Sequence, residues 1–166
     1  MSISMYSASI PALRRGLTSL AAILIKAEEH ARARKFDPAV LLAARLYPDM
    51  FPVTKQVQIA TDNAKGCAAR LAGREIPKYE DSETSFAELA ERIAKTLAFL
   101  DTVGPEHVDG SEERDISLQA GGQTHEFKGL AYLTTWVLPN FYFHVTTAYA
   151  ILRHNGVEIT KKDFLG

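Results

Sequence analysis

The clearest evidence for the fold lies in residues 138–153, which read Leu-Pro-Asn-Phe-Tyr-Phe-His-Val-Thr-Thr-Ala-Tyr-Ala-Ile-Leu-Arg. Apolar residues recur there at steps of three and four, the period of a helix that buries one face. The inward face is Phe141, His144, Val145, Ala148, Ile151 and Leu152. Pro139 lacks a backbone N–H, so we expect a kink or break near Leu138 in a helical region from about 129 to 155. The stretch predicts the last helix of a bundle, with an imidazole on its inner face.

Three earlier stretches carry apolar stripes of the same period. The first is expected to begin at Ser9 as N-cap and presents Ile10, Leu13, Leu17, Leu20, Leu24, Ala27 and Ala31. The second begins near Pro52, stops at Gly73 and presents Val53, Val57, Ala60, Ala64, Cys67 and Leu71. The third begins at a Ser85/Glu88 capping box and presents Phe86, Leu89, Ile93, Leu97 and Leu100. Between the first two, a short helix over 39–46 and an interruption over 47–52 are expected.

The period changes to two around Gly121-Gly122, a strong turn signal for a β-hairpin. Strands over 115–120 and 123–128 would pair Leu118 with His125 and Ile116 with Phe127, all on one side that could lie on the bundle. The predicted fold class is therefore mainly all-α: a four-helix bundle with a small β-hairpin between the third and fourth helices. We expect a single domain over residues 1–166.

Composition narrows the classes of function. The chain has 166 residues, of which 46% are hydrophobic and 23% charged, and its formal net charge is −1. These values are typical of an ordinary globular domain and give no field that favours nucleic acid or an anionic membrane surface. Cys67 is the single cysteine, so no intrachain disulfide can form. The apolar run over 17–25 is shorter than a membrane span, and a cytoplasmic protein is the simplest interpretation.

Few residues suggest chemistry. The sequence has no Gly-rich phosphate loop, and no two of its five histidines lie three or four residues apart. His144 differs from the others because it lies mid-way along an apolar face, four residues after Asn140. Gln56 lies on the flank of the second stripe, whereas Gln58 shares a face with Asp62 and Lys65 and should point to water. Gln56, Asn140 and His144 would form either a buried hydrogen-bond network or a small polar ligand pocket.

The chain resembles, over nearly all its length, an uncharacterised domain-of-unknown-function branch of the DinB/YfiT-like metalloenzyme superfamily. The resemblance is carried by Met5-Tyr6, by residues 46–50 and 56–60, and most specifically by residues 138–144, 148–153 and 163–165. It implies a four-helix bundle, often dimeric, with a divalent metal held by one helix-two His and an H-x-x-x-H pair on the last helix. Some relatives are thiol-dependent transferases or isomerases.

The metal ligands of that pattern are replaced in this chain. The H-x-x-x-H positions match Asn140 and His144, and the helix-two His matches Gln56. One imidazole and two carboxamides are a poor ligand set for Zn or Ni, so no metal and no other cofactor is expected. His125 is the one inner-face candidate to replace a lost ligand, if the hairpin covers the bundle.

Three functions remain open. The first, which we prefer, is a protein that binds a small-molecule ligand in the former metal pocket, through Gln56, Asn140, His144 and His125. The second is a thiol-dependent transferase or isomerase, or a metal-dependent hydrolase-like enzyme, that uses His144. The third is a structural or interaction module whose polar cluster only fixes the core. The resemblance and the near-neutral charge favour a homodimer; no nucleic acid or membrane partner is expected.

Overall fold

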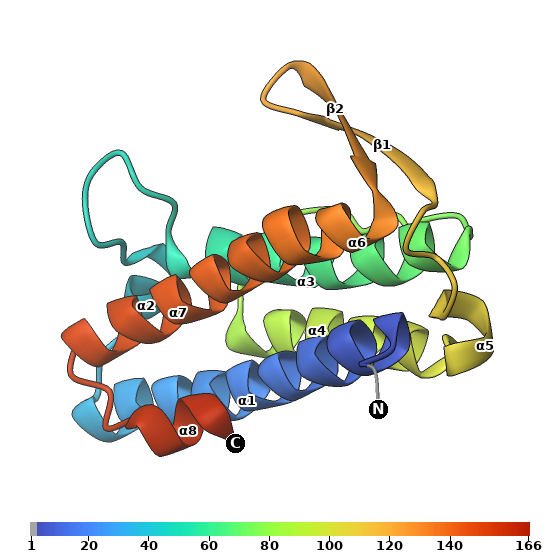
Figure 1. Cartoon of the computed structure of the whole chain (residues 1–166). Coiled ribbons are helices and arrows are strands. Elements are labelled where there is room, and N and C mark those ends of the chain that lie inside the picture. Colours follow the sequence, from blue (N-terminus) through green and yellow to red (C-terminus); the bar gives the residue numbers. More distant parts are fainter. Residues whose placement is uncertain (1–2) are drawn as a thin grey trace.

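The computed structural model describes residues 3–166, and its core is four helices packed in two layers (Figure 1). These are α1 (Met5–Arg34), α3 (Val53–Ala72), α4 (Phe86–Asp101) and α7 (Leu138–His154). Helix α3 contacts the other three, most extensively α7. The buried apolar side chains of all four helices meet in one cluster, which includes every apolar residue of the predicted stripes except the partly buried Leu97. The predicted four-helix bundle is confirmed.

Short elements join the long helices. Helix α2 (Ala39–Ala43) precedes a segment, residues 44–52, that we call the joint, and α5 (Pro105–Val108) follows α4. The last short helix, α8 (Lys161–Leu165), lies along α1 (Figure 1). Helix α2 ends three residues earlier than the sequence predicts. The joint is tied down by two hydrogen bonds, from the Val53 N–H to the Ala44 carbonyl (3.1 Å) and from the Thr54 hydroxyl to the Leu42 carbonyl (3.2 Å).

The hairpin has the predicted register. Strands β1 (Asp115–Ala120) and β2 (Gln123–Lys128) pair Ile116 with Phe127 and Leu118 with His125. Both turn glycines have positive φ, as a two-residue hairpin turn requires. Ile116 and Leu118 are buried, while β2 is mostly exposed, and the hairpin projects from the end of the bundle near α6 (Gly129–Ala131) (Figure 1).

The expected interruption before Pro139 takes the form of a π-helical segment, Tyr132–Val137, between α6 and α7. Because proline lacks an N–H, it cannot supply the hydrogen bond that a regular α-helix needs there, and the wider turn accommodates the change. The π segment turns Tyr132 into the core and leaves Trp136 half-buried. Helical structure therefore continues through the proline instead of stopping.

The start of α1 differs from the prediction. The N-cap is Ser4, whose hydroxyl oxygen accepts the Ser7 N–H at 3.2 Å, and not Ser9. Ser9 is buried and its hydroxyl donates to the Met5 carbonyl at 2.6 Å. The added turn is supported from afar, because the Asp109 carboxylate accepts the Tyr6 N–H at 2.8 Å. A cap more than 100 residues away leaves no local signal in the sequence.

Helix α1 is the one helix among residues 3–166 that is long and apolar enough to cross a membrane by length and composition. Its apolar window of 18 residues is longer than the run over 17–25. Half of that window is buried inside the bundle, where Leu13, Leu17 and Leu20 are part of the core. The apolar character of α1 is thus accounted for by packing.

Candidate functional site

The structure brings two of the predicted site residues into direct contact. The Nδ1 atom of His144, on α7, lies 2.7 Å from the Oε1 atom of Gln56, on α3. Both side chains come from the inner faces of the two helices that pack most closely in the bundle. Gln56 is 1% exposed and His144 is 9% exposed. Burying both groups is tolerable because each satisfies the other.

The joint fixes which way the Gln56 carboxamide points. Its Nε2 donates to the main-chain carbonyl of Phe51 at 3.0 Å, and a carbonyl can only accept. The Oε1 atom therefore faces His144, and because this oxygen also only accepts, the hydrogen between them belongs to His144 Nδ1. The chain from Phe51 through Gln56 thus selects the Nδ1–H tautomer of the neutral ring.

The second ring nitrogen of His144 is consequently a hydrogen-bond acceptor. In the neutral Nδ1–H tautomer, Nε2 carries a lone pair. Within residues 3–166, Nε2 of His144 has no hydrogen-bond partner, whereas Nδ1 has one. Among the fully buried side-chain polar atoms of these residues, Ser111 Oγ alone lacks a partner. Nε2 is therefore not fully buried, and solvent reaches it. Burial lowers the pKa of His144, which keeps the ring neutral near pH 7. The arrangement is chemically a positioned base or acceptor.

Asn140 and His125 do not join this pair. The Asn140 amide donates to the Trp136 carbonyl, one turn back on its own helix, at 2.7 Å. His125 lies on β2, where Nε2 is 3.3 Å from the Ala120 carbonyl and the ring packs 4.8 Å from the Trp136 ring. The expectation that His125 could replace a lost metal ligand is therefore not supported by its position, because the hairpin projects from the bundle end and does not cover its middle (Figure 1).

The residues present do not fit the divalent metal that the resemblance implies. Two carboxamides and one imidazole make a poor set for such a metal, and both carboxamides are already engaged in hydrogen bonds, Gln56 with Phe51 and His144 and Asn140 with Trp136. Among residues 3–166, no three His, Cys, Asp or Glu side chains are grouped so that they could hold a metal ion. We therefore derive no chemistry through a metal.

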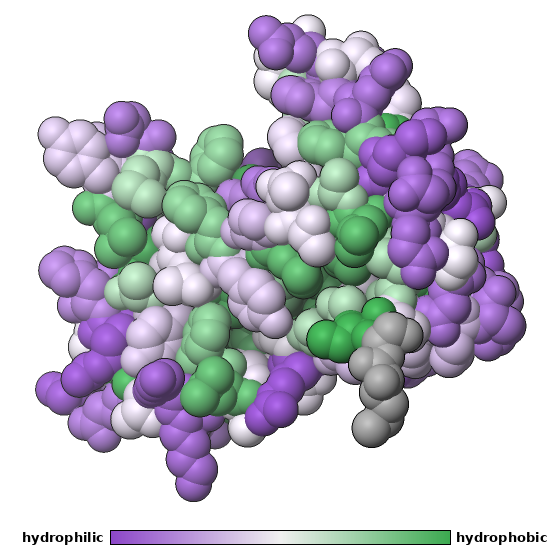
Figure 2. Space-filling model, in the orientation of Figure 1, coloured by the Kyte–Doolittle hydropathy of each residue, from purple (hydrophilic) through white to green (hydrophobic). Residues whose placement is uncertain are grey.

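A shallow groove lies on the outer side of α7. It has a volume of about 460 Å³ and is lined by Leu46, Tyr142, Phe143, Thr146, Thr147 and Ala150. The ring of Phe143 meets the His144 ring edge-on, with centroids 5.2 Å apart. Figure 2 shows apolar side chains gathered on this face, along α7 and around the joint. The groove itself is not lined by Gln56, Asn140 or His144.

The single thiol is not available for chemistry. Cys67 is fully buried in α3, and this burial raises its pKa to about 12. A cysteine acts as a nucleophile only as a thiolate, which this environment strongly disfavours. Any thiol used by the protein would have to come from a co-substrate.

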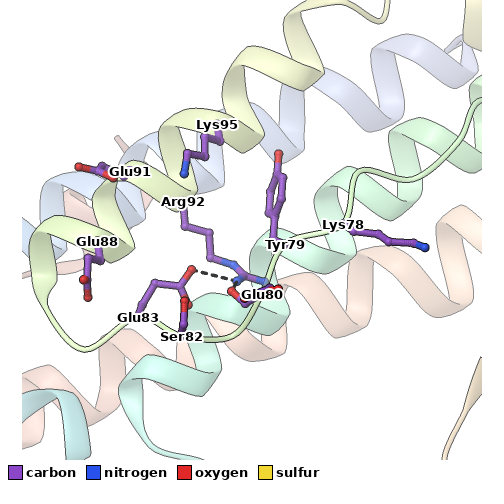
Figure 3. Close-up of a pocket in the computed structure, with 9 residues that line it drawn as sticks. All are labelled: Lys78, Tyr79, Glu80, Ser82, Glu83, Glu88, Glu91, Arg92 and Lys95. Carbon is purple, nitrogen blue, oxygen red and sulfur yellow. Dashed lines mark hydrogen bonds and ion pairs between the residues drawn. The ribbon is translucent and has the colours of Figure 1, made fainter.

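Sequence reasoning missed a second polar centre, around Arg92 of α4 (Figure 3). The Arg92 side chain is 2% exposed, and its guanidinium contacts Asp62 (2.8 Å), Asp81 (3.1 Å) and Glu83 (3.0 Å). It also donates to the Thr61 hydroxyl (2.8 Å) and the Glu80 carbonyl (3.0 Å). We call the segment over residues 74–84, which supplies three of these partners, the strap.

The strap also corrects the prediction for Gln58. Gln58 and Lys65 are buried rather than solvent-facing. The Gln58 amide donates to Glu83 at 2.8 Å, and the Lys65 ammonium lies 4.5 Å from the centre of the Tyr79 ring. A polar helix face can be buried when a charged loop folds over it, and a sequence read one helix at a time gives no sign of this. Every member of the centre is paired, so it reads as structural.

Comparison with known proteins agrees with this fold. The model of a domain of unknown function, DUF1993, matches residues 5–165. A crystal structure described as a DinB family member protein from Shewanella denitrificans is 42% identical in sequence and has a TM-score of 0.88, covering 97% of this chain and 91% of that chain. No curated protein matches the chain. The resemblance seen in the sequence is confirmed, and this chain belongs to the DUF1993 family, with a DinB-like fold.

Proposed function

We propose that this protein binds a small molecule through a hydrogen bond to Nε2 of His144, at a DinB-like site that has lost its metal ligands. The observation that carries the proposal is the Phe51–Gln56–His144 chain. Because solvent reaches Nε2, this atom can bond either a water molecule or a donor group of a ligand that replaces the water. The ligand must offer a donor, because Nε2 is an acceptor.

A second candidate is general-base catalysis at the same atom. The lowered pKa of His144 favours it, because a neutral imidazole is the form that accepts a proton. The base would take the proton from the S–H or O–H of a bound co-substrate. Since Cys67 is buried with its pKa raised, a thiol-dependent reaction would use an external thiol. We place binding first because the geometry supplies an acceptor without a second catalytic group.

The experiment is a melting-shift screen of small phenols, amines and amides against the wild type, His144→Phe and His154→Phe. His154 is an exposed histidine at the end of the same helix, so its replacement is the matched control. We expect some compounds to raise the melting temperature of the wild type and of His154→Phe but not of His144→Phe. The same compounds should move the ¹⁵N resonance of His144 Nε2. If no donor compound moves that resonance, the pair is structural only and the proposal is wrong.

We also propose that the protein works without a divalent metal, as a cytoplasmic homodimer. The donor set around His144 supports the first point. The near-neutral charge, which causes little self-repulsion, supports the last. Elemental analysis that finds one transition metal per chain, lost in His144→Ala, would overturn the metal-free proposal.

A further inference from the structure

We infer that two copies of this chain associate through one face of the bundle, on which the joint of each copy docks in a shallow hollow between α1, α7 and α8 of the other copy. This inference rests on the homodimer proposed above and adds the surface that forms it. The face carries two apolar features of opposite shape, a projecting loop and a hollow. A second copy of this chain is the occupant that fits both at once.

The joint is the projecting feature. It stands out from the bundle between α2 and α3 (Figure 1). Its large apolar side chains Leu46, Tyr47 and Phe51 are 44%, 65% and 53% exposed. The hydrogen bond from the Val53 N–H to the Ala44 carbonyl closes the base of the joint at 3.1 Å. These side chains are therefore presented on a defined loop, and only a partner can remove them from water.

The hollow lies on the same face, between three helices. It has a volume of about 490 Å³, and its apolar walls are Pro11 of α1, Tyr142 of α7, and Phe164 and Leu165 of α8. Tyr142 also lines the groove that Leu46 borders, so the hollow and the joint adjoin through this one side chain. Joint, groove and hollow thus form one continuous apolar surface, part of which is visible along α7 and around the joint in Figure 2.

The exposed apolar area has the size that a dimer needs. Ten large apolar side chains are exposed among residues 3–166, and six of them belong to this face: Leu46, Tyr47, Phe51, Tyr142, Phe143 and Leu165. Each of the six is between 39% and 65% exposed. At about 200 Å² for a side chain of this size, they leave about 600 Å² in water. That area equals the largest patches of ordinary monomers, about 300–600 Å², and is most of the roughly 800 Å² that one partner buries in a stable complex.

Two-fold symmetry explains why both features lie on one face. In a symmetric dimer the same patch meets itself, so a contact from one copy to the other is always matched by its reverse. A two-fold axis near Tyr142 places each joint over the hollow of the other copy and covers both joints and both hollows. The charges agree with this pairing, because Asp49 is exposed on the joint and Arg15 is exposed at the hollow. Opposite charges then meet at both ends of the interface.

A lipid surface is the alternative occupant of an apolar face. Segments that lie on membranes surround their apolar side chains with Lys and Arg, which bind anionic headgroups. Residues 138–152, which supply the middle of this face, contain no Lys or Arg, and the joint carries one charge of each sign, Arg45 and Asp49. This pattern favours a second copy over a membrane.

The first test is analytical ultracentrifugation of the full chain. We expect a dimer whose dissociation constant rises at least about tenfold in Tyr47→Asp and in Phe143→Asp, because each variant places a charge where apolar side chains meet. Leu130→Asp is the matched control. Leu130 is 49% exposed on α6, away from the joint and from α8, and its replacement should leave the dissociation constant unchanged (Figure 1). Circular dichroism checks that all three variants fold.

The second test is cross-linking, which reports the parts that meet. Cys67 is fully buried and does not react with a bis-maleimide, so thiols can be introduced one at a time. Tyr47→Cys chains mixed with Leu165→Cys chains should give a cross-linked dimer with a short bis-maleimide. Tyr47→Cys chains mixed with Leu130→Cys chains should not.

The outcomes separate this inference from the proposals it rests on. A dimer that is unchanged in both Asp variants, or a Tyr47→Cys and Leu165→Cys mixture that does not cross-link, would overturn the assigned face and leave the homodimer proposal standing. A wild type that stays a monomer at high micromolar concentration would overturn both, and its flotation with phosphatidylcholine vesicles would identify lipid as the occupant. Ligand binding at His144 is measured separately, by the ring resonance, and does not depend on either result.

Discussion

Replacing Arg92 by methionine is expected to lower the free energy of unfolding at pH 7 by about 3 kcal/mol. Removal of one member of a buried ion pair costs about 3–5 kcal/mol, because it leaves the partner's charge without compensation. Glu83 is the partner that suffers most, since its side chain is only 11% exposed. The side chains of Asp62 and Asp81 are 43% and 37% exposed, so water recovers much of their loss. The lower end of the range therefore applies.

Urea and thermal unfolding followed by circular dichroism measure this loss. For a chain of this length, about 3 kcal/mol corresponds to a fall of about 6–12 °C in melting temperature. Lys95→Met is the matched control, because Lys95 is an exposed cation one turn along α4 that lines the same hollow (Figure 3). Its replacement should change the free energy of unfolding by less than about 0.5 kcal/mol.

The same network predicts how the difference between wild type and Arg92→Met depends on pH. Burial raises the pKa of Asp81 and Glu83, but hydrogen bonds and charges from Lys55, Gln58 and Arg92 outweigh it, so both carboxyls have a lowered pKa. A carboxyl whose pKa is lower in the folded state than in the unfolded chain stabilises the fold when it is ionised. This contribution is complete at a pH above the ordinary pKa, which is 3.8 for Asp81 and 4.5 for Glu83. It disappears as the pH falls through the folded-state pKa. The difference should therefore shrink below about pH 4.

Two results would refute this reasoning. A loss of less than about 1 kcal/mol at pH 7 would mean that the guanidinium does not hold the strap against α3 and α4. A loss of full size that is the same at pH 7 and at pH 3 would mean that packing of the side chain, and not its charge, is what the variant removes. Arg92→Met combined with Glu83→Gln should recover part of the stability, because no buried carboxylate is then left unpaired.

Other variants and measurements test the remaining parts of the structure. Gln56→Glu should raise the pKa of His144, because a carboxylate beside Nδ1 favours the imidazolium. NMR titration of the ring measures this pKa, and an unchanged pKa would mean that the contact is absent. His144 should also make the wild type lose stability as the pH falls below 6.5, because its folded-state pKa is lowered; a His144→Phe chain should lack that step. His125→Ala should red-shift the emission of Trp136, the one tryptophan, by loosening the hairpin, and an unchanged spectrum would contradict this. Sedimentation should give a homodimer, and a monomer at high micromolar concentration would end that proposal.

The features predicted correctly from the sequence are those that local rules govern. The Ser85/Glu88 capping box and the hairpin register each depend on residues within 13 positions of one another. The contact of Gln56 with His144 spans 88 positions, but both residues interrupt strong apolar stripes, and such interruptions must meet a polar partner. Helix period places each residue on the inner side of its own helix, and the packing of α3 against α7 brings the two together.

The features that were missed depend on contacts that no helix pattern contains. Asp81 and Glu83 lie in a segment that has neither a helix nor a strand period, so the sequence does not show that they meet Arg92. Gln58 and Lys65 form a polar stripe that would face water in an isolated helix. The strap covers that stripe, and the burial follows from the strap rather than from α3.

The carboxamide at position 56 would join the proposed binding to the stability of the fold. An imidazole there could give a metal one lone pair, whereas a carboxamide offers a donor and an acceptor at once. Gln56 uses both, so it ties the joint to α7 through the Phe51 carbonyl and the His144 ring. The groove lies between these same two elements. A variant that frees the joint should thus weaken both the fold and the positioning of the His144 acceptor.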